Sequence, residues 1–407
     1  MHIARRFTAM AFLAGTIAMN ASAQTVTEGR AAGEPVSFAS LDGWMQDDQL
    51  AALRTFERSC SGPHPSVVAA ALAFAEQTRD AAVPRHDPAL EPACKALIEA
   101  GGASRFDGES ARRFFETWFE PVPVVLPGNA PGHVTAYYEP ELDGALAPDP
   151  NHPAPLYARP VDLVPVDPTK LPSGLPEGLT AARRTRAGLE PYPERAALSD
   201  PQGRNGLVPL VWLRNEVDAY FVHIQGSVRV RVADGSTMRL GYAGKNGHPY
   251  RSAGRAMIER GLVPEAGMTA EAMKAWLKAH PDLASDILAV NPSYVFFQVI
   301  EGLADELGPI GAEGVALTPG RSLAVDPRHI GYGAPVFITA DLPTGTAMRT
   351  EPFRRLMIAQ DTGSAIRGPA RGDLFWGTGA QAGEIAGRIS HPATFHVLRP
   401  RSQPAQR

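Results

Sequence analysis

Near its C-terminal end the chain reads Ala359-Gln-Asp-Thr-Gly-Ser-Ala-Ile-Arg-Gly368 and, two residues later, Arg371-Gly-Asp-Leu-Phe-Trp-Gly-Thr-Gly379. Two carboxylates, Asp361 and Asp373, therefore lie twelve positions apart, each with a glycine within two residues. Cleavage of a glycosidic bond needs a carboxylic acid that protonates the leaving oxygen, and burial or a neighbouring carboxylate keeps such an acid protonated near neutral pH. Aspartate and glycine close together are also typical of turns, so the pattern alone leaves both interpretations open.

Two aromatic residues and a third aspartate accompany this pair. Phe375 and Trp376 follow Asp373 directly, and aromatic faces commonly pack on sugar rings. Asp326 lies in Leu323-Ala-Val-Asp-Pro-Arg-His329, where it is either a further candidate catalytic carboxylate or a turn cap before the proline.

Outward from this stretch, the sequence alternates between helical and β-type patterns. Apolar residues have helical spacing over residues 41–121, and two further helices are predicted over Tyr250–Arg260 and Thr269–His280. Short apolar runs bounded by glycine and proline predict strands at His133–Tyr138, Val208–Trp212, Ala219–Ile224, Val228–Val232, Tyr294–Phe297, Ala334–Thr339 and Arg355–Ala359. The pattern predicts a mainly β protein with added helices (α+β), with a second β domain inside the sequence of the first.

The first 23 residues have the pattern of a secretory signal peptide. Arg5 and Arg6 precede a thirteen-residue apolar run, Phe7–Met19, and Ala21-Ser-Ala23 is a small-x-small cleavage site. The apolar run is shorter than the roughly 20 residues of a membrane-spanning helix, and no cysteine follows it to carry a lipid anchor. We therefore expect a periplasmic protein without a lipid anchor, which begins with a disordered linker at residues 24–40.

The composition argues against several classes of function. Thirty-nine basic and 43 acidic residues give a formal net charge of −4, which lacks the basic footprint of a nucleic-acid-binding protein. The eleven histidines show no helical pair with metal-ligand spacing, and two cysteines are too few for a multi-thiolate site. No metal or other cofactor is predicted. Cys60 and Cys94 either form one disulfide or remain buried thiols, and the sequence leaves both alternatives open.

Six stretches match one protein family in the same order along the chain. They are Thr135–Tyr138, His223–Ser227, Tyr242–Ser252, Asn291–Phe297, Ser322–Asp326 and Asp361–Gly379. On these residues the chain resembles the membrane-bound lytic murein transglycosylase A (MltA) family, whose C-terminal part is called the 3D domain after three aspartates.

The resemblance implies a double-psi β-barrel with added helices and a second, smaller β-barrel domain inserted within it. The helical part and the first strands of the main domain are expected over residues 41–138, and the inserted domain over residues 139–241. The main domain then continues over residues 242–398, with the 3D barrel at about residues 293–398. A groove between the two domains is expected to hold the substrate.

The resemblance also implies an activity. Family members cleave the β-1,4 bond between N-acetylmuramic acid and N-acetylglucosamine in peptidoglycan without water, which leaves a 1,6-anhydro product. The family's catalytic aspartate corresponds to Asp373, which would act first as acid and then as base. The other two named aspartates correspond to Asp361 and Asp326, which would tune the pKa of that acid or hold the barrel loops. The expected partner is the glycan strand, with the outer membrane or proteins of wall synthesis as candidate peripheral partners.

A substrate-binding set is predicted on the same basis. Its members are Tyr137, Tyr138, Gln225, Ser227, Lys245, Asn246, Phe375 and Trp376. Except for the last two, these side chains have an alternative role in hydrogen bonds that join the two domains.

Two other functions are consistent with the same residues. An inverting β-glycosidase on this barrel would need a second carboxylate, Asp361 or Asp326, roughly 6.5–9.5 Å from the first to activate water. A non-catalytic, expansin-like module that binds the cell wall is the other alternative, although the presence of all three aspartates weighs against it.

Overall fold

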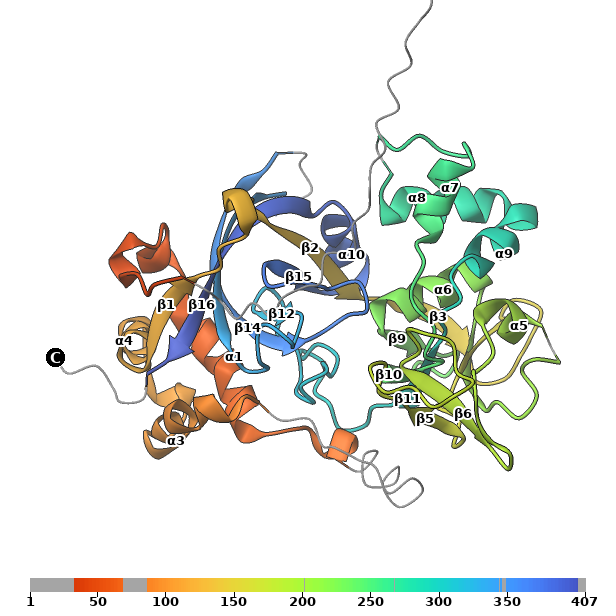
Figure 1. Cartoon of the computed structure of the whole chain (residues 1–407), viewed down its shortest axis with the longest axis horizontal. Coiled ribbons are helices and arrows are strands. Elements are labelled where there is room, and N and C mark those ends of the chain that lie inside the picture. The colour runs from red at the N-terminus through yellow and green to blue at the C-terminus, as the bar shows by residue number, and fades with distance from the viewer. Residues whose placement is uncertain are drawn as a thin grey trace, which may run out of the picture.

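The computed structural model describes residues 33–68, 86–200, 202–266, 268–343, 345 and 349–401. Two β units lie side by side, with helices packed around them (Figure 1). The predicted signal peptide lies outside the described residues. Of the predicted disordered linker, the last residues are instead ordered, because the Val36 N–H donates to the Pro121 carbonyl and residues Phe38–Ser40 form a 3-10 helix.

The first unit is a seven-stranded sheet that closes into a barrel. Its order is β1 (Phe119–Pro123), β16 (Ser390–Pro400), β13 (Pro335–Leu342), β14 (Glu351–Asp361), β12 (Ser322–Ala324), β15 (Arg371–Thr378) and β2 (Gly132–Glu139). The pairing of β2 with β16 closes the barrel and leaves β1 outside it. The pairs β12–β14 and β15–β2 are parallel, and the other neighbours are antiparallel.

Alternation along the strands divides their side chains between the barrel interior and its outer face. Each of the six closed strands contributes to one buried interior cluster, for example Val134, Leu323 and Leu374. On the outer face of β13, β14 and β16, Phe337, Leu356 and neighbouring residues pack against helices. On the outer face of β2 and β15 lie the polar residues Thr135, Tyr137 and Asp373, which form the site described below together with Asp361 at the end of β14.

Helices α1 (Gln49–Ser61), α3 (Glu91–Glu99) and α4 (Gly108–Trp118) cover the outer face of the barrel, at the lower left of Figure 1. The Asp48 side chain caps α1, and a capping box at Asp107 begins α4. Cys60 on α1 and Cys94 on α3 form a disulfide, with their Cα atoms 5.1 Å apart. The two cysteines therefore form a disulfide rather than two buried thiols.

We expect loss of this disulfide to lower the free energy of unfolding by about 3–4 kcal/mol, because the bridge closes a loop between residues 34 positions apart and constrains the unfolded chain. The measurement is urea unfolding of the Cys60→Ser/Cys94→Ser double variant. Wild-type protein in reductant is the control, and it should match the variant. An unfolding midpoint equal to that of the oxidised wild type would contradict the prediction.

The second unit is built on a six-stranded sheet. Its order is β11 (Val295–Val299), β10 (Thr237–Lys245), β9 (Ser227–Arg231), β3 (Glu141–Ala145), β8 (Pro209–Leu213) and β4 (Ala154–Tyr157). A parallel bridge between Ala158 and Phe297 brings its two edges together. A three-stranded sheet, β5 (Leu163–Pro165), β6 (Ala181–Thr185) and β7 (Gly188–Glu190), lies beside it. The predicted domain end at residue 241 falls within β10, and the sheet extends to residue 299.

The described residues contain six further α-helices. They are α5 (Arg195–Ser199), α6 (Glu216–Gln225), α7 (Ala253–Glu259), α8 (Ala270–Ala279), α9 (Pro281–Ala289) and α10 (Gly379–Ala386). Short 3-10 helices lie at Trp44–Gln46, Pro88–Leu90, Ala103–Arg105 and Pro127–Asn129. Helix α10 follows β15 on the barrel, whereas α7, α8 and α9 pack together with α6 at the upper right of Figure 1.

The predicted fold class, a mainly β protein with added helices and two β-barrel units, is confirmed. One predicted strand is wrong, because Ala219–Ile224 lies within α6. The Asn215 side chain caps the first turn of this helix, and Gly226 ends it in the left-handed conformation with φ of 80°. Helix α9 was not expected from the sequence.

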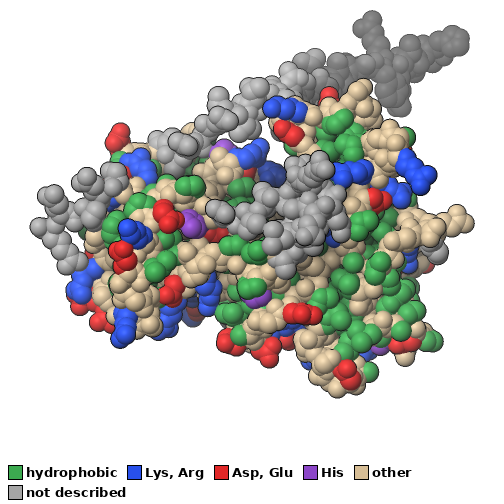
Figure 2. All heavy atoms as spheres, turned by 90° about the horizontal axis from the view of Figure 1, so that it is seen from below, with side chains coloured by type: hydrophobic (Ala, Val, Ile, Leu, Met, Phe, Trp, Pro, Cys, Tyr) green, Lys and Arg blue, Asp and Glu red, His purple; other side chains and the backbone are tan. Residues whose placement is uncertain are grey.

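On the face shown in Figure 2, basic and acidic side chains are interspersed with apolar ones, as the small net charge suggests. In the part of the chain that the structure describes, every helix is too short or too polar to span a lipid bilayer.

Candidate active site

Four residues on neighbouring strands form a row across the outer face of the barrel. Ala324 on β12 is the register partner of both Asp361 on β14 and Asp373 on β15, and Asp373 in turn pairs with Thr135 on β2. Both aspartates therefore lie in strands rather than turns. Because neighbouring strands are about 5 Å apart, the two aspartate backbones are about 10 Å apart, with only the small alanine side chain between them.

A threonine and an arginine hold the Asp373 carboxylate. The Thr135 hydroxyl donates to Asp373 Oδ1 over 2.5 Å, and Arg371 Nη2 donates to the same hydroxyl oxygen over 2.8 Å. The second carboxylate oxygen, Oδ2, has no hydrogen-bond donor among the described residues. Thr135 thus fixes one oxygen of Asp373, and the other has no protein donor among the described residues.

Asp361 is held through both of its oxygens. The Tyr137 hydroxyl donates to Asp361 Oδ2 over 2.6 Å, and the Ala312 N–H donates to Oδ1 over 2.9 Å. Tyr137 lies two residues after Thr135 and therefore on the same face of β2. One strand thus supplies a hydroxyl group to each of the two carboxylates.

Burial raises the pKa of Asp373 to about 6. The hydrogen bond from Thr135 and the charge of Arg371 oppose this rise, and the nearby charge of Asp361 adds to it. Burial also raises the pKa of Asp361, although the hydrogen bonds from Tyr137 and the backbone oppose it. About a tenth of Asp373 is therefore protonated at pH 7, far more than of an ordinary aspartate, and protonation is what a general acid requires.

Asp326 has a different environment. Burial alone would raise its pKa, but hydrogen bonds from Arg328 and from the Gly368 N–H outweigh this effect and lower the pKa to about 2. Arg328 Nε and Nη2 donate to its two oxygens over 2.9 and 2.6 Å, and the Gly368 N–H donates to Oδ2 over 2.9 Å. Asp326 is therefore an ionised residue that links two loops, with its side chain committed to those loops.

The two aromatic residues predicted to contact a sugar lie on opposite faces of β15. Phe375 is fully buried against Tyr137, Leu317 and Ala324, so its ring has no exposed face in this structure. Trp376, the next residue, points to the opposite face of β15, where its ring packs against Phe353 at a centroid distance of 6.3 Å. Trp376 therefore lies on the other side of the strand from Asp373.

Two of the remaining predicted residues form hydrogen bonds within the protein. Gln225 Oε1 accepts from the Tyr138 N–H over 3.1 Å and thereby joins α6 to β2. The Tyr138 hydroxyl accepts from Lys274 on α8 over 3.3 Å. The observed contacts of Tyr138 and Gln225 are thus hydrogen bonds between the two units, the alternative role that the sequence left open.

Lys245, Asn246 and Ser227 all belong to the second unit but differ in environment. Lys245 Nζ donates to Ser364 Oγ over 3.0 Å and so reaches the loop between Asp361 and β15. Asn246 is fully buried, and its side-chain amide donates to two backbone carbonyls and accepts from the Tyr294 N–H, so its observed partners all belong to the protein. Ser227 is also buried, at the start of β9.

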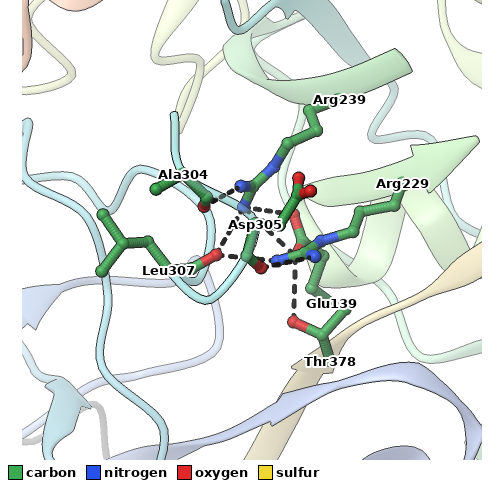
Figure 3. Close-up of polar contacts among 7 residues, drawn as sticks. All are labelled: Glu139, Arg229, Arg239, Ala304, Asp305, Leu307 and Thr378. Atoms are coloured by element: carbon green, nitrogen blue, oxygen red, sulfur yellow. Dashed lines mark hydrogen bonds and ion pairs between the residues drawn. The ribbon is translucent and has the colours of Figure 1, made fainter. Parts of the chain in front are cut away.

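A buried charged cluster joins the two units at the end of β2 (Figure 3). Arg229 Nε donates to Glu139 Oε2 over 2.7 Å, Arg239 Nη2 lies 3.4 Å from the same oxygen, and the Thr378 hydroxyl donates to it over 3.0 Å. Both guanidinium groups also donate to the Leu307 carbonyl. The cluster connects β2 and β15 of the barrel with β9, β10 and the loop that contains Leu307.

The residues predicted as catalytic or binding did not include Thr135, Arg371 or Ala312, which all make hydrogen bonds in the site. Thr135 and Arg371 lie within the quoted motifs, and their spacing of two residues from Tyr137 and Asp373 places each pair on one strand face. The Ala312 N–H carries no sequence signal, because any residue except proline supplies one. Within the described residues, no three His, Cys, Asp or Glu side chains are grouped to hold a metal ion.

Comparisons with known proteins agree with this fold. The model of the MltA specific insert domain matches residues 133–298, and that of the 3D domain matches residues 321–399. The membrane-bound lytic murein transglycosylase of Agrobacterium tumefaciens has a crystal structure that is 36% identical, with a TM-score of 0.73, over 90% of this chain and 97% of that one. MltA from Neisseria gonorrhoeae is 29% identical, with a TM-score of 0.71, over 92% and 94% of the respective chains.

A curated relative, membrane-bound lytic murein transglycosylase A of Escherichia coli K12, is 33% identical over 194 residues. That match covers 47% of this chain and 52% of the relative, so the chain spans about half the length of the curated relatives it matches. The two domain models and the Agrobacterium structure nevertheless cover the barrel and the second unit together. The chain belongs to the MltA family of lytic murein transglycosylases.

Proposed function

We propose that this protein is a lytic transglycosylase that cleaves the β-1,4 bond between N-acetylmuramic acid and N-acetylglucosamine in peptidoglycan. The observation that carries the proposal is Asp373, a half-buried carboxyl group with a pKa raised to about 6 by burial and with one oxygen held by Thr135. The names of the family's members support the same activity. Glycan strands of the periplasmic cell wall are the proposed substrate.

In the proposed reaction, Asp373 acts first as an acid and then as a base. Its proton passes to the glycosidic oxygen as the bond from that oxygen to C1 of the muramic acid breaks. The C6 hydroxyl oxygen of the same sugar then bonds to C1, and its proton returns to Asp373. The products are a 1,6-anhydro sugar and a new chain end, and no water is consumed. Because the attack is intramolecular, the protein has only to orient the sugar.

The contacts of the other two aspartates favour this reaction over an inverting hydrolysis. A hydrolase needs a second carboxylate that is free to accept a proton from water. Both oxygens of Asp361 accept hydrogen bonds from Tyr137 and Ala312, and those of Asp326 accept from Arg328 and Gly368. Asp361 is proposed instead to keep Asp373 protonated through its negative charge, and Asp326 to hold the loops.

The products separate the two reactions. Purified peptidoglycan is digested, and the soluble muropeptides are analysed by mass spectrometry. We expect products one water lighter than the corresponding hydrolysis products. Products of full mass with reducing ends would reject the transglycosylase and support the glycosidase, whereas binding to the wall without any soluble product would support a non-catalytic module.

The activity should fall as the pH rises through about 6, because the reaction begins with protonated Asp373 and burial sets the pKa of this group to about 6. In Asp361→Asn the neighbouring negative charge is absent, so the pKa of Asp373 is lower and the falling limb should move to lower pH. The measurement is kcat/KM against pH for both proteins. Superimposable profiles would contradict the proposed role of Asp361.

A further inference from the structure

A small cavity in the second unit is lined by polar groups that the proposed reaction does not use. Its volume is about 40 Å³, it is partly open to solvent, and it lies among β4, α5, α6 and α9. Its walls include Arg195, Tyr220 and His223, while Arg204 and Glu216 also line it. A water molecule needs roughly 10–15 Å³ of such volume, so the cavity has room for about three atoms of second-row size.

Arg195 is a buried cation without an ion-pair partner. Its side chain is 5% exposed, and no carboxylate of the described residues lies within 4.0 Å of its guanidinium group. It donates to the carbonyls of Asn291 and Ser293 and to His223 Nδ1, and it lies over the rings of two tyrosines. The nearest acidic lining residue, Glu216, is instead paired with Arg204 at 3.8 Å. A buried charge of this kind is costly unless an opposite charge accompanies it.

His223 adds a hydrogen-bond donor to the same cavity. Burial, together with the charge of Arg195, lowers the pKa of His223 well below its usual value, so the imidazole is neutral. A guanidinium group can only donate, so Nδ1 accepts the hydrogen bond from Arg195 and Nε2 carries the hydrogen. This buried Nε2–H has no partner among the described residues.

The ring of Tyr220 also lines the cavity, but its hydroxyl interacts with the side chains of Tyr250 and Asn291, which do not line it. The cavity wall thus combines a buried positive charge with one unsatisfied donor, and a guanidinium group has more N–H groups than the three contacts of Arg195 use. Water would satisfy the donors but would leave the charge of Arg195 uncompensated.

We infer that this cavity binds a small monovalent anion of the size of a carboxylate group. Such a group supplies the negative charge that Arg195 has no partner for, and it offers only acceptor atoms to His223 Nε2. It can be a free ion or, because the cavity is partly open, the terminal carboxylate of a peptide. The inference does not depend on the proposed reaction.

The test is thermal unfolding of the full chain in increasing sodium formate at pH 7. Ionic strength is kept constant with the sodium salt of a bulky sulfonate, which is too large for a 40 Å³ cavity. We expect a saturable rise in Tm, because a ligand that binds the folded state alone stabilises it. No saturable rise would mean that the cavity holds only water, and it would overturn the inference.

His223→Phe provides the decisive comparison, because it removes the Nε2–H donor that has no partner among the described residues and keeps a ring of similar shape. Its half-maximal formate concentration should be at least about tenfold higher, because a hydrogen bond to a charged ligand is lost. Circular dichroism of the variant without formate shows that it is folded. The control is Tyr192→Phe, whose hydroxyl donates to Asp162 elsewhere in the second unit and whose formate response should equal that of wild type. Equal responses in all three proteins would overturn the inference.

The source of the anion is identified with two matched peptides. An acetylated dipeptide with a free C-terminal carboxylate is compared with the same dipeptide as its carboxamide. A saturable rise in Tm with the acid alone, at lower concentration than formate, identifies a peptide end, and a response to formate alone identifies a free ion. Equal responses to acid and amide would show that the carboxylate is not recognised, which would also overturn the inference.

Discussion

Asp373→Asn should lower the rate of anhydro-muropeptide release from peptidoglycan by at least about 100-fold and up to about 10,000-fold, the usual contribution of a general acid. The amide cannot donate a proton to the leaving oxygen as an acid does, and it cannot accept the proton of the C6 hydroxyl. The replacement has nearly the same shape, so its oxygen can still accept from Thr135, as Asp373 Oδ1 does over 2.5 Å. The measurement is the initial rate of soluble product by mass spectrometry.

The control for this variant is Asp341→Asn, on an exposed position of β13 with an ion pair to Arg354. It should retain the wild-type rate. Sedimentation of both variants with insoluble peptidoglycan separates the loss of chemistry from the loss of binding, because Asp373→Asn is expected to remain bound. A rate for Asp373→Asn within about tenfold of wild type would assign the acid to another residue.

Glu139→Gln should destabilise the protein by about 3–5 kcal/mol, the usual effect of removing one partner from a buried ion pair. Glu139 is 1% exposed and is the carboxylate shared by Arg229 and Arg239 in the cluster of Figure 3. Glutamine can still accept a hydrogen bond there, but it carries no charge, so two buried guanidinium groups would lose the carboxylate that they share. Urea unfolding measures the loss, and because the cluster joins the two units, we also expect separate transitions for them.

Asp143→Asn is the matched control, because Asp143 also pairs with two arginines, Arg214 and Arg231, but on the surface. Solvent screens such pairs, so its change in stability should be below about 1 kcal/mol. If both variants lost the same stability, the cluster at Glu139 would have no special role in joining the units.

The sequence pointed to the two carboxylates of the candidate site more clearly than to the residues that surround them. Asp361 and Asp373 could be found because their motif is local and an acid is needed for glycosidic cleavage. Phe375 could not be placed, because its adjacency to Asp373 says nothing of Leu317 and Tyr137, which cover it. Asn246 shows the same limit, since its polar side chain is buried by hydrogen bonds to backbone groups that are distant in sequence.

The error at α6 has a different physical cause. An apolar run such as Ala219–Ile224 fits a buried strand and a buried helix equally well, because no polar face shows its period. The signals that decide between them lie outside the run, in the Asn215 cap and the left-handed Gly226. Both residues can be recognised from the sequence, so this error was avoidable. The burial of Phe375 could not be predicted in the same way, because the residues that cover it are distant in the sequence.

The closure of the barrel by β2 and β16 has a consequence for the order of folding. Thr135 and Asp373, which meet in the site, are 238 residues apart, and the whole second unit is synthesised between them. Long-range strand pairs of this kind form late, because the entropy of closing the loop is lost before the contacts compensate for it. The second unit can fold first and, because Glu139 binds both Arg229 of that unit and Thr378 at the end of β15, bring the two ends of that loop together. The catalytic row would then form in one of the last steps, so that an incompletely folded chain has no active acid.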